Sequence, residues 1–167
     1  TEICVFCHTP HHSNPATPLW NKQLPGDNYD IYQSLTMVAT GTGQPTGASK
    51  LCLSCHDGTI AIGSMLNLPG AGTGIGGAYG GTIPVTGPGI SSGIISSAST
   101  SYIGTDLRDD HPISFIYPNS PEINPTSLFS PDIKLENGNL VQCTSCHDPH
   151  WTQYSKFLLR SLENGEM

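Results

Sequence analysis

The sequence predicts a mostly irregular coil with a few short helices and little sheet. Composition is the first reason: the 167 residues include 19 glycines, 14 prolines and 18 serines. Together they exceed the share of about 25–30% that is typical of low-complexity or disordered chains. Only 36% of the residues are hydrophobic and 7% aromatic, which is too little for a self-sufficient core at this length.

The second reason is that every cysteine falls in one of three copies of Cys-x-x-Cys-His. The six cysteines are Cys4, Cys7, Cys52, Cys55, Cys143 and Cys146. This pattern is the attachment signature of c-type haem. The two thiols add across the haem vinyl groups as thioethers, and the histidine that follows presents its imidazole to the iron.

Zinc ribbons and redox dithiols also use Cys-x-x-Cys, so the spacing between copies matters. A zinc site pairs two such units across about 15–20 residues. Here the intervals are several times longer and the number of units is odd. We therefore expect three covalent haems c.

Three haems would supply the apolar surface that the sequence lacks, so we expect them to form the core with the chain as their wrapping. The expected helices are short and lie at the attachment motifs. Residues 1–167 are predicted to form a single triheme cytochrome c domain. It includes an uncharged segment rich in Gly, Ser and Thr at about residues 58–105.

Seven histidines are available for the six axial positions of three haems. The proximal ligands are predicted to be His8, His56 and His147, and the distal ligands His11, His111 and His150. His12 is the spare, an alternative to His11, or a ligand to a neighbouring subunit's haem. Met37 and Met65 are alternative axial ligands, although methionines in loops more often pack.

Spacing suggests how the distal histidines act. His11 and His150 each stand three residues after a proximal histidine, about one helical turn away. Neither is then expected to reach the far face of its own haem, so each would bind another haem's iron. His111 follows Asp109 and Asp110, and a carboxylate beside an axial histidine often orients the ring; the same pair could equally form a solvated turn.

Five stretches of the chain resemble a bacterial multihaem cytochrome family that includes secreted cytochromes of metal-reducing bacteria. They are residues 4–11, 18–21, 50–59, 110–114 and 143–150. The chain is similar to relatives that polymerise into extracellular filaments, the cytochrome nanowires. Residues 60–105 have no counterpart in this resemblance, which implies electron transfer through closely spaced haems.

Two classes of function fit three haems. An electron-transfer protein has six-coordinate irons, whereas a reductase keeps one haem open and places acid–base groups over it. Seven histidines more than fill six places, so we expect electron transfer and no enzyme activity. A soluble periplasmic shuttle is the main alternative to a filament, and a multihaem reductase is a further one.

We expect the protein to be secreted to the cell surface or beyond, or else to be periplasmic, because haem c is attached outside the cytoplasm. The sequence starts close to its first cysteine, which suggests a cleaved secretion signal. No apolar run is long enough to span a membrane. The net charge of −7 makes nucleic acid an unsuitable partner, whereas redox proteins or extracellular electron acceptors fit.

The uncharged residues 58–105 allow two interpretations. They could form a flexible glycine-rich loop, or a packed surface that docks against another subunit or carries sugars. With His11 and His12 near the start of the chain, the second interpretation predicts a homopolymer. In it, a histidine of one subunit would bind a haem of the next, and such head-to-tail contacts propagate into a fibre.

Overall fold

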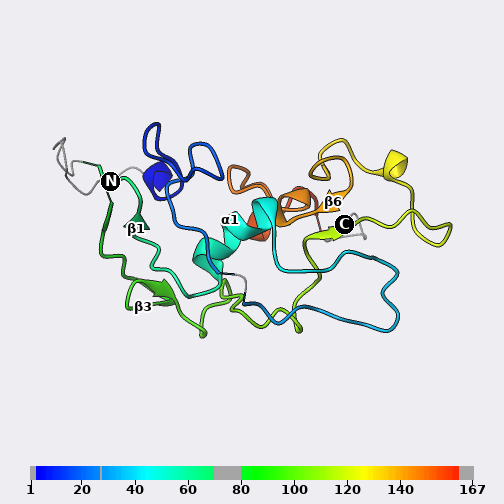
Figure 1. The fold of residues 1–167 in the computed structure, drawn as a ribbon, viewed down its shortest axis with the longest axis horizontal. Coiled ribbons are helices and arrows are strands. Elements are labelled where there is room, and N and C mark those ends of the chain that lie inside the picture. Colours follow the sequence, from blue (N-terminus) through cyan, green and yellow to red (C-terminus); the bar gives the residue numbers. More distant parts are fainter. Residues whose placement is uncertain (1–2, 27, 70–79, 162–167) are drawn as a thin grey trace. The chain divides into compact units, whose positions relative to one another are not determined.

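The computed structural model describes residues 3–26, 28–69 and 80–161, and within them irregular coil predominates (Figure 1). One α-helix is described, α1 (Gly47–His56). The 3-10 helices are η1 (Ile3–Phe6), η2 (Thr126–Leu128), η3 (Cys143–Ser145) and η4 (Ser155–Phe157). The prediction of short helices at the attachment motifs is confirmed. The helix η1 overlaps the first motif, α1 ends with the second, and η3 begins at the third.

The described strands are two residues long and form three antiparallel pairs. They are β1 (Ser64–Met65) with β2 (Gly81–Thr82), β3 (Ile90–Ser91) with β4 (Ile94–Ile95), and β5 (Phe115–Ile116) with β6 (Leu140–Val141). The predicted scarcity of sheet is therefore confirmed. Residues 70–79 of the glycine-rich segment lie outside the described residues.

The chain divides into two compact units. The first comprises Thr1–Gly26 and Leu53–Thr105, and the second Asp27–Cys52 and Asp106–Met167. Each unit contains one complete attachment motif and one cysteine of the second motif. The prediction of a single domain refers to the chain with its haems and stays a prediction.

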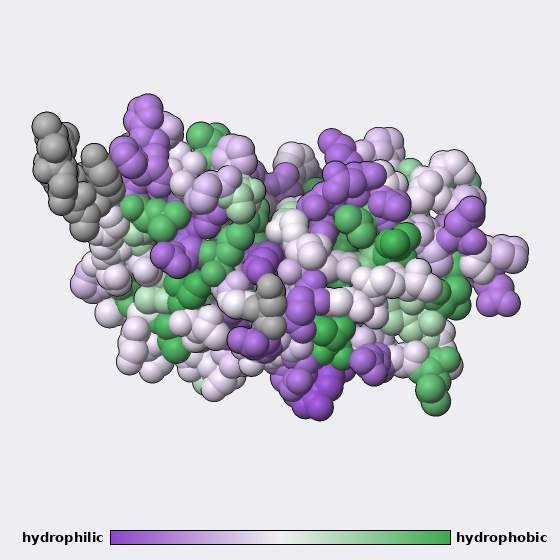
Figure 2. Space-filling model, viewed as in Figure 1, coloured by the Kyte–Doolittle hydropathy of each residue, from purple (hydrophilic) through white to green (hydrophobic). Residues whose placement is uncertain are grey.

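Hydrophobic burial is sparse in the described part of the chain. The buried hydrophobic side chains are Tyr29, Leu53, Met65, Ile95, Leu107 and Leu158. Others are exposed, including Ile3 at 80% and Leu128 at 70%, and apolar side chains reach the surface in Figure 2. A chain of this length ordinarily buries most of its apolar surface, so the polypeptide alone has a thin core.

In the first unit, the uncharged segment packs against the first motif. The Asn21 side chain donates to the carbonyls of Val5, at 2.7 Å, and Asn67, at 3.0 Å. The Asn67 side chain in turn donates to the Thr9 hydroxyl at 2.8 Å and to the His11 carbonyl at 3.0 Å. This part of the segment is therefore tied to the motif.

In the second unit, buried polar groups join α1 to the third motif. The Gln142 Oε1 accepts hydrogen bonds from the hydroxyls of Ser49, at 2.6 Å, and Ser114, at 2.8 Å. The Ser49 hydroxyl also accepts from the Cys143 backbone N–H at 3.0 Å. Glu136 accepts from the Ala48 N–H at 3.0 Å, which places a carboxylate at the helix N-terminus, where it is favourable.

Candidate functional site

The first and third motifs fold into the same tight turn. The carbonyl of Cys4 accepts from the N–H groups of Cys7, at 3.1 Å, and His8, at 2.8 Å. The carbonyl of Cys143 likewise accepts from Cys146, at 3.2 Å, and His147, at 2.9 Å. In each motif both cysteines and the histidine are thus held by one carbonyl.

The second motif differs because it forms the last turns of α1. Leu53, which lies inside the motif, is fully buried, and His56 is the last helical residue. Gly58 has a φ of +71°, a conformation that commonly ends a helix and that glycine adopts without strain.

The residue after each histidine makes the same local hydrogen bond two residues on. Asp57 Oδ1 accepts from the Thr59 N–H at 2.8 Å, and Asp148 Oδ1 from the His150 N–H at 2.8 Å. The Thr9 hydroxyl accepts from the His11 N–H at 3.4 Å. Such turns by Asp and Thr redirect the chain immediately after each histidine.

Two of the three predicted proximal imidazoles are oriented by backbone carbonyls. His56 Nδ1 lies 2.7 Å from the Ser101 carbonyl oxygen, and His147 Nδ1 lies 2.7 Å from that of Lys156. A carbonyl can only accept, so each Nδ1 carries the proton. Nε2 then has its lone pair available for a metal, which is the usual way in which a ligand histidine is oriented.

The third proximal candidate, His8, is held against an aromatic ring. Its ring meets Trp20 edge-on, with ring centroids 6.2 Å apart and an interplanar angle of 80°. A backbone bridge also pairs His8 with Trp20, as another pairs His147 with Leu158. In both motifs, a later part of the chain therefore returns to pair with the motif histidine, so the motifs share this pairing as well as their tight turn.

The structure brings His111 and His147 together. Their ring centroids are 6.4 Å apart and their planes differ by 12°. Two imidazoles bound on opposite sides of one metal ion would have centroids about 6.2 Å apart, from two metal–nitrogen bonds of about 2.0 Å and two ring radii of about 1.1 Å. The two stacked, nearly parallel rings therefore lie at about the separation that two histidines on one iron would have.

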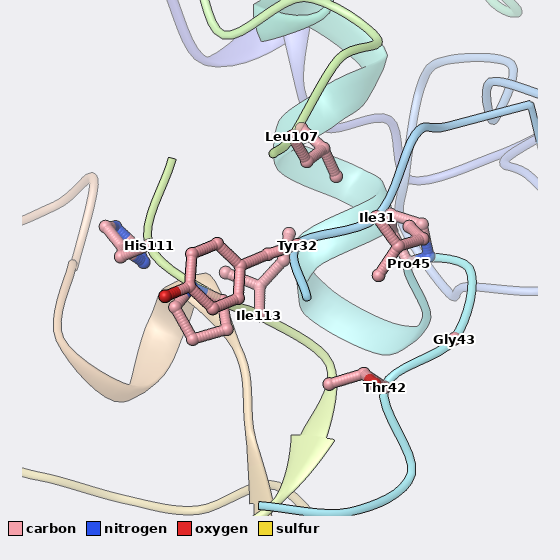
Figure 3. A pocket seen from close by; sticks show the side chains of 9 residues that line it. Ile31, Tyr32, Thr42, Gly43, Pro45, Leu107, His111 and Ile113 are labelled. Carbon is pink, nitrogen blue, oxygen red and sulfur yellow. The ribbon is translucent and has the colours of Figure 1, made fainter. Parts of the chain in front are cut away.

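His111 also borders a shallow pocket in the second unit (Figure 3). The lining residues are Ile31, Tyr32, Thr42, Gly43, Pro45, Leu107, His111, Pro112 and Ile113. The predicted orientation of the His111 ring by a neighbouring carboxylate is not seen. In the described part of the chain, neither Asp109 nor Asp110 forms a hydrogen bond with the His111 ring. Burial is the main cause that raises the pKa of Asp110, and the charge of Asp109 raises it further.

The remaining distal candidates are exposed, and one has a carboxylate partner. His150 Nδ1 lies 3.2 Å from Asp148 Oδ1, whereas His11 and His12 lie on the surface. The premise that His11 and His150 stand one helical turn beyond the proximal histidines is wrong. The chain has left its short helix at both places, because Pro10 and Pro149 disfavour helix in the residue before them.

The thiols of the second motif approach those of the other two. Burial raises the pKa of Cys7, and the nearby Cys55 raises it further. In the second unit, a hydrogen bond with Cys52 is the main cause that lowers the pKa of Cys143, to about 7. Sequence reasoning did not predict these contacts between motifs.

Within the described residues, no group of three or more His, Cys, Asp or Glu side chains could enclose a bare metal ion. Haem iron needs only axial ligands from the protein, and the His111–His147 pair fits that requirement. The six cysteines form no disulfides and can serve as thioether donors. The residues present therefore fit haem c.

No protein-family model matches the chain, and no curated protein matches it. No helix in the described ranges is long and apolar enough to cross a membrane. The local geometry is therefore the basis for a functional conclusion.

Sequence reasoning missed the groups that orient the ligands and one buried cation. The carbonyls of Ser101 and Lys156 left no signal, since every residue has a carbonyl. Lys22 could have been noticed, because the chain has only six lysines and arginines and this one directly follows Trp20-Asn21.

Proposed function

We propose that this chain is an electron-transfer protein that holds three c-type haems, each with two histidine ligands. The observation that supports it most is the His111–His147 pair, whose ring centroids lie 6.4 Å apart. Such a bis-histidine site leaves no open position on the iron, which suits electron transfer and disfavours substrate binding.

Each part of the chain has a role in this proposal. The cysteine pairs form the thioethers, and His8, His56 and His147 supply the proximal Nε2 atoms. His111 completes the third site, and His11 and His150 are the distal ligands proposed for the others, with His12 in reserve. The bound haem supplies a one-electron iron couple, while the chain orients the imidazoles and excludes water.

The resemblance to filament-forming cytochromes extends the proposal to a secreted homopolymer. The exposure of His11 and His12 supports it, because an exposed imidazole is accessible to a haem of a neighbouring subunit. Ile3, at 80% exposure, and Leu19, at 54%, add apolar surface near the same motif. Other redox proteins or extracellular acceptors would receive the electrons.

Haem content tests the electron-transfer proposal directly. The intact protein, purified from a host that attaches haem c, is expected to exceed its polypeptide mass by three haems under denaturing mass spectrometry. A Cys143→Ala/Cys146→Ala variant should retain two. Electron paramagnetic resonance of the ferric wild type should show only low-spin iron.

Zinc in place of haem, or fewer than three haems in the wild type, would contradict the proposal. A persistent high-spin signal would instead favour a reductase with one open haem.

A further inference from the structure

A fully buried lysine lies in the first unit, between two attachment motifs. Lys22 has a relative exposure of 0%. Its Nζ lies 2.6 Å from the Ile62 carbonyl oxygen, 3.0 Å from that of Ser64 and 3.3 Å from that of Ala61. All three carbonyls belong to the uncharged segment that folds over the motifs.

The contacts of Lys22 suit a charged ammonium. An ammonium has three N–H donors and no acceptor, and here three carbonyl oxygens surround it. A neutral amine has only two N–H bonds, so it would turn its lone pair toward one of these oxygens. None of the ion pairs formed by the described residues involves Lys22, so its contacts are with carbonyl dipoles and the Cys55 side chain.

This arrangement is costly for a structural residue. Burying a charge without a counter-ion is among the most unfavourable changes in a protein interior. A hydrophobic side chain of similar length would fill the same space without that cost. The charge itself therefore calls for a role.

The charge lies beside cysteines that would hold two of the haems. The side chain of Lys22 forms a hydrogen bond with that of Cys55. The backbone N–H of Asn21, the residue before Lys22, donates to the Cys7 carbonyl at 2.8 Å. The ammonium is therefore next to the Cys55 sulfur, and its backbone adjoins the first motif.

We propose that Lys22 is a redox-tuning residue that raises the reduction potential of the haem attached through Cys55, and to a lesser degree that of the haem attached through Cys7. Reduction adds one electron to the iron, and no bond forms or breaks. A fixed positive charge in a low-dielectric interior stabilises the state with the additional electron. This inference rests on the proposed function, because it concerns haems that the motifs would hold.

The experiment compares charge-neutral, charge-retaining and control variants of the holoprotein. Lys22→Gln and Lys22→Met remove the charge, and Lys22→Gln keeps two N–H donors. Lys22→Arg retains the charge. Lys134→Met is the matched control, because it removes an equal charge from an exposed side chain.

Haem content is measured first by mass, and reduction is then followed optically at an electrode. In both neutral variants, the reduced-to-oxidised ratio of one haem at a fixed potential should fall about tenfold, equivalent to about 59 mV for one electron. Lys22→Arg and Lys134→Met should overlay the wild type. Paramagnetic NMR of haem methyl groups should assign the shift to the haem on Cys55.

Absence of three haems from the wild type would overturn the proposed function. Three haems in Lys22→Gln with wild-type potentials would overturn only the tuning role. That role is also rejected if neither neutral variant can be isolated with three haems, since Lys22 would then be a structural residue.

Discussion

Two of the three predicted proximal histidines are oriented by backbone carbonyls. His56 and His147 each direct Nδ1 to a backbone carbonyl at 2.7 Å. His150 differs, since its Nδ1 lies 3.2 Å from the Asp148 carboxylate. At the residue scale, two kinds of hydrogen bond thus fix the ring orientations, one from the backbone and one from an acidic side chain.

Replacement of His111 by alanine should affect one haem only. The His111–His147 separation predicts that the haem on Cys143 and Cys146 loses its sixth ligand and becomes partly high-spin. His12→Ala, the matched control, should leave the ferric spectrum almost unchanged. Electron paramagnetic resonance and optical spectra of the two holoproteins make the comparison; an unchanged low-spin spectrum in His111→Ala, or a high-spin signal in His12→Ala, would reverse the ligand assignment.

Much of the site, but not its support, is predictable from the sequence. The spacing of the motifs marks the cysteines and the histidines proposed as proximal ligands, and counting histidines leads to His111 as a proposed distal ligand. The pairing of His56 with Ser101 spans 45 residues without any periodic pattern to indicate it. The full burial of Lys22 is contrary to what its residue type predicts, because lysine is rarely fully buried.

At the scale of elements, the helices at the three motifs differ in length. Pro10 and Pro149 stand two residues after the motif histidines, and the helices at these motifs are 3-10 helices of three or four residues. The second motif has no nearby proline and forms the end of α1, a helix of ten residues. The sequence indicated short helices at the motifs but not this contrast in length, and it did not indicate the pairing of β1 with β2, since both strands are two residues long.

Gly63 precedes β1 at a point where the chain has no room for a side chain. A Cβ there would overlap the carbonyl oxygen of Ile83, whose N–H donates to the Gly63 carbonyl at 2.9 Å. Overpacking usually costs about 1–3 kcal/mol, so Gly63→Ala should lower the free energy of unfolding by about that amount. Denaturant titration of the holoprotein measures the loss.

Gly43→Ala is the matched control for this prediction. A Cβ at Gly43 would meet nothing within 4 Å, so this variant should unfold close to the wild-type midpoint. Equal stability of the Gly63→Ala and Gly43→Ala proteins would contradict the close approach of Gly63 to Ile83.

At the scale of the whole molecule, the thin hydrophobic core and the exposed apolar side chains require an explanation. Ordering the backbone costs about 1–2 kcal/mol per residue, and the six buried hydrophobic side chains of the described ranges can offset only a small part. Haems and neighbouring subunits are the two sources of further apolar contact in the proposed function.

Electron microscopy of the secreted holoprotein tests the filament. We expect fibres in which each subunit contacts the next in the same orientation. His11→Ala/His12→Ala should convert the fibres to discrete particles, while His111→Ala should not, because the His111–His147 pair lies within one chain. Discrete particles of the wild-type protein would contradict the filament.

The use of backbone carbonyls at His56 and His147 has an evolutionary consequence. A point mutation can delete a carboxylate but cannot delete a carbonyl, so Ser101 and Lys156 can change identity while the rings keep their orientation. What selection must preserve at these positions is the path of the chain. The residues at positions 101 and 156 could therefore change while His56 and His147 still present the same imidazole nitrogen.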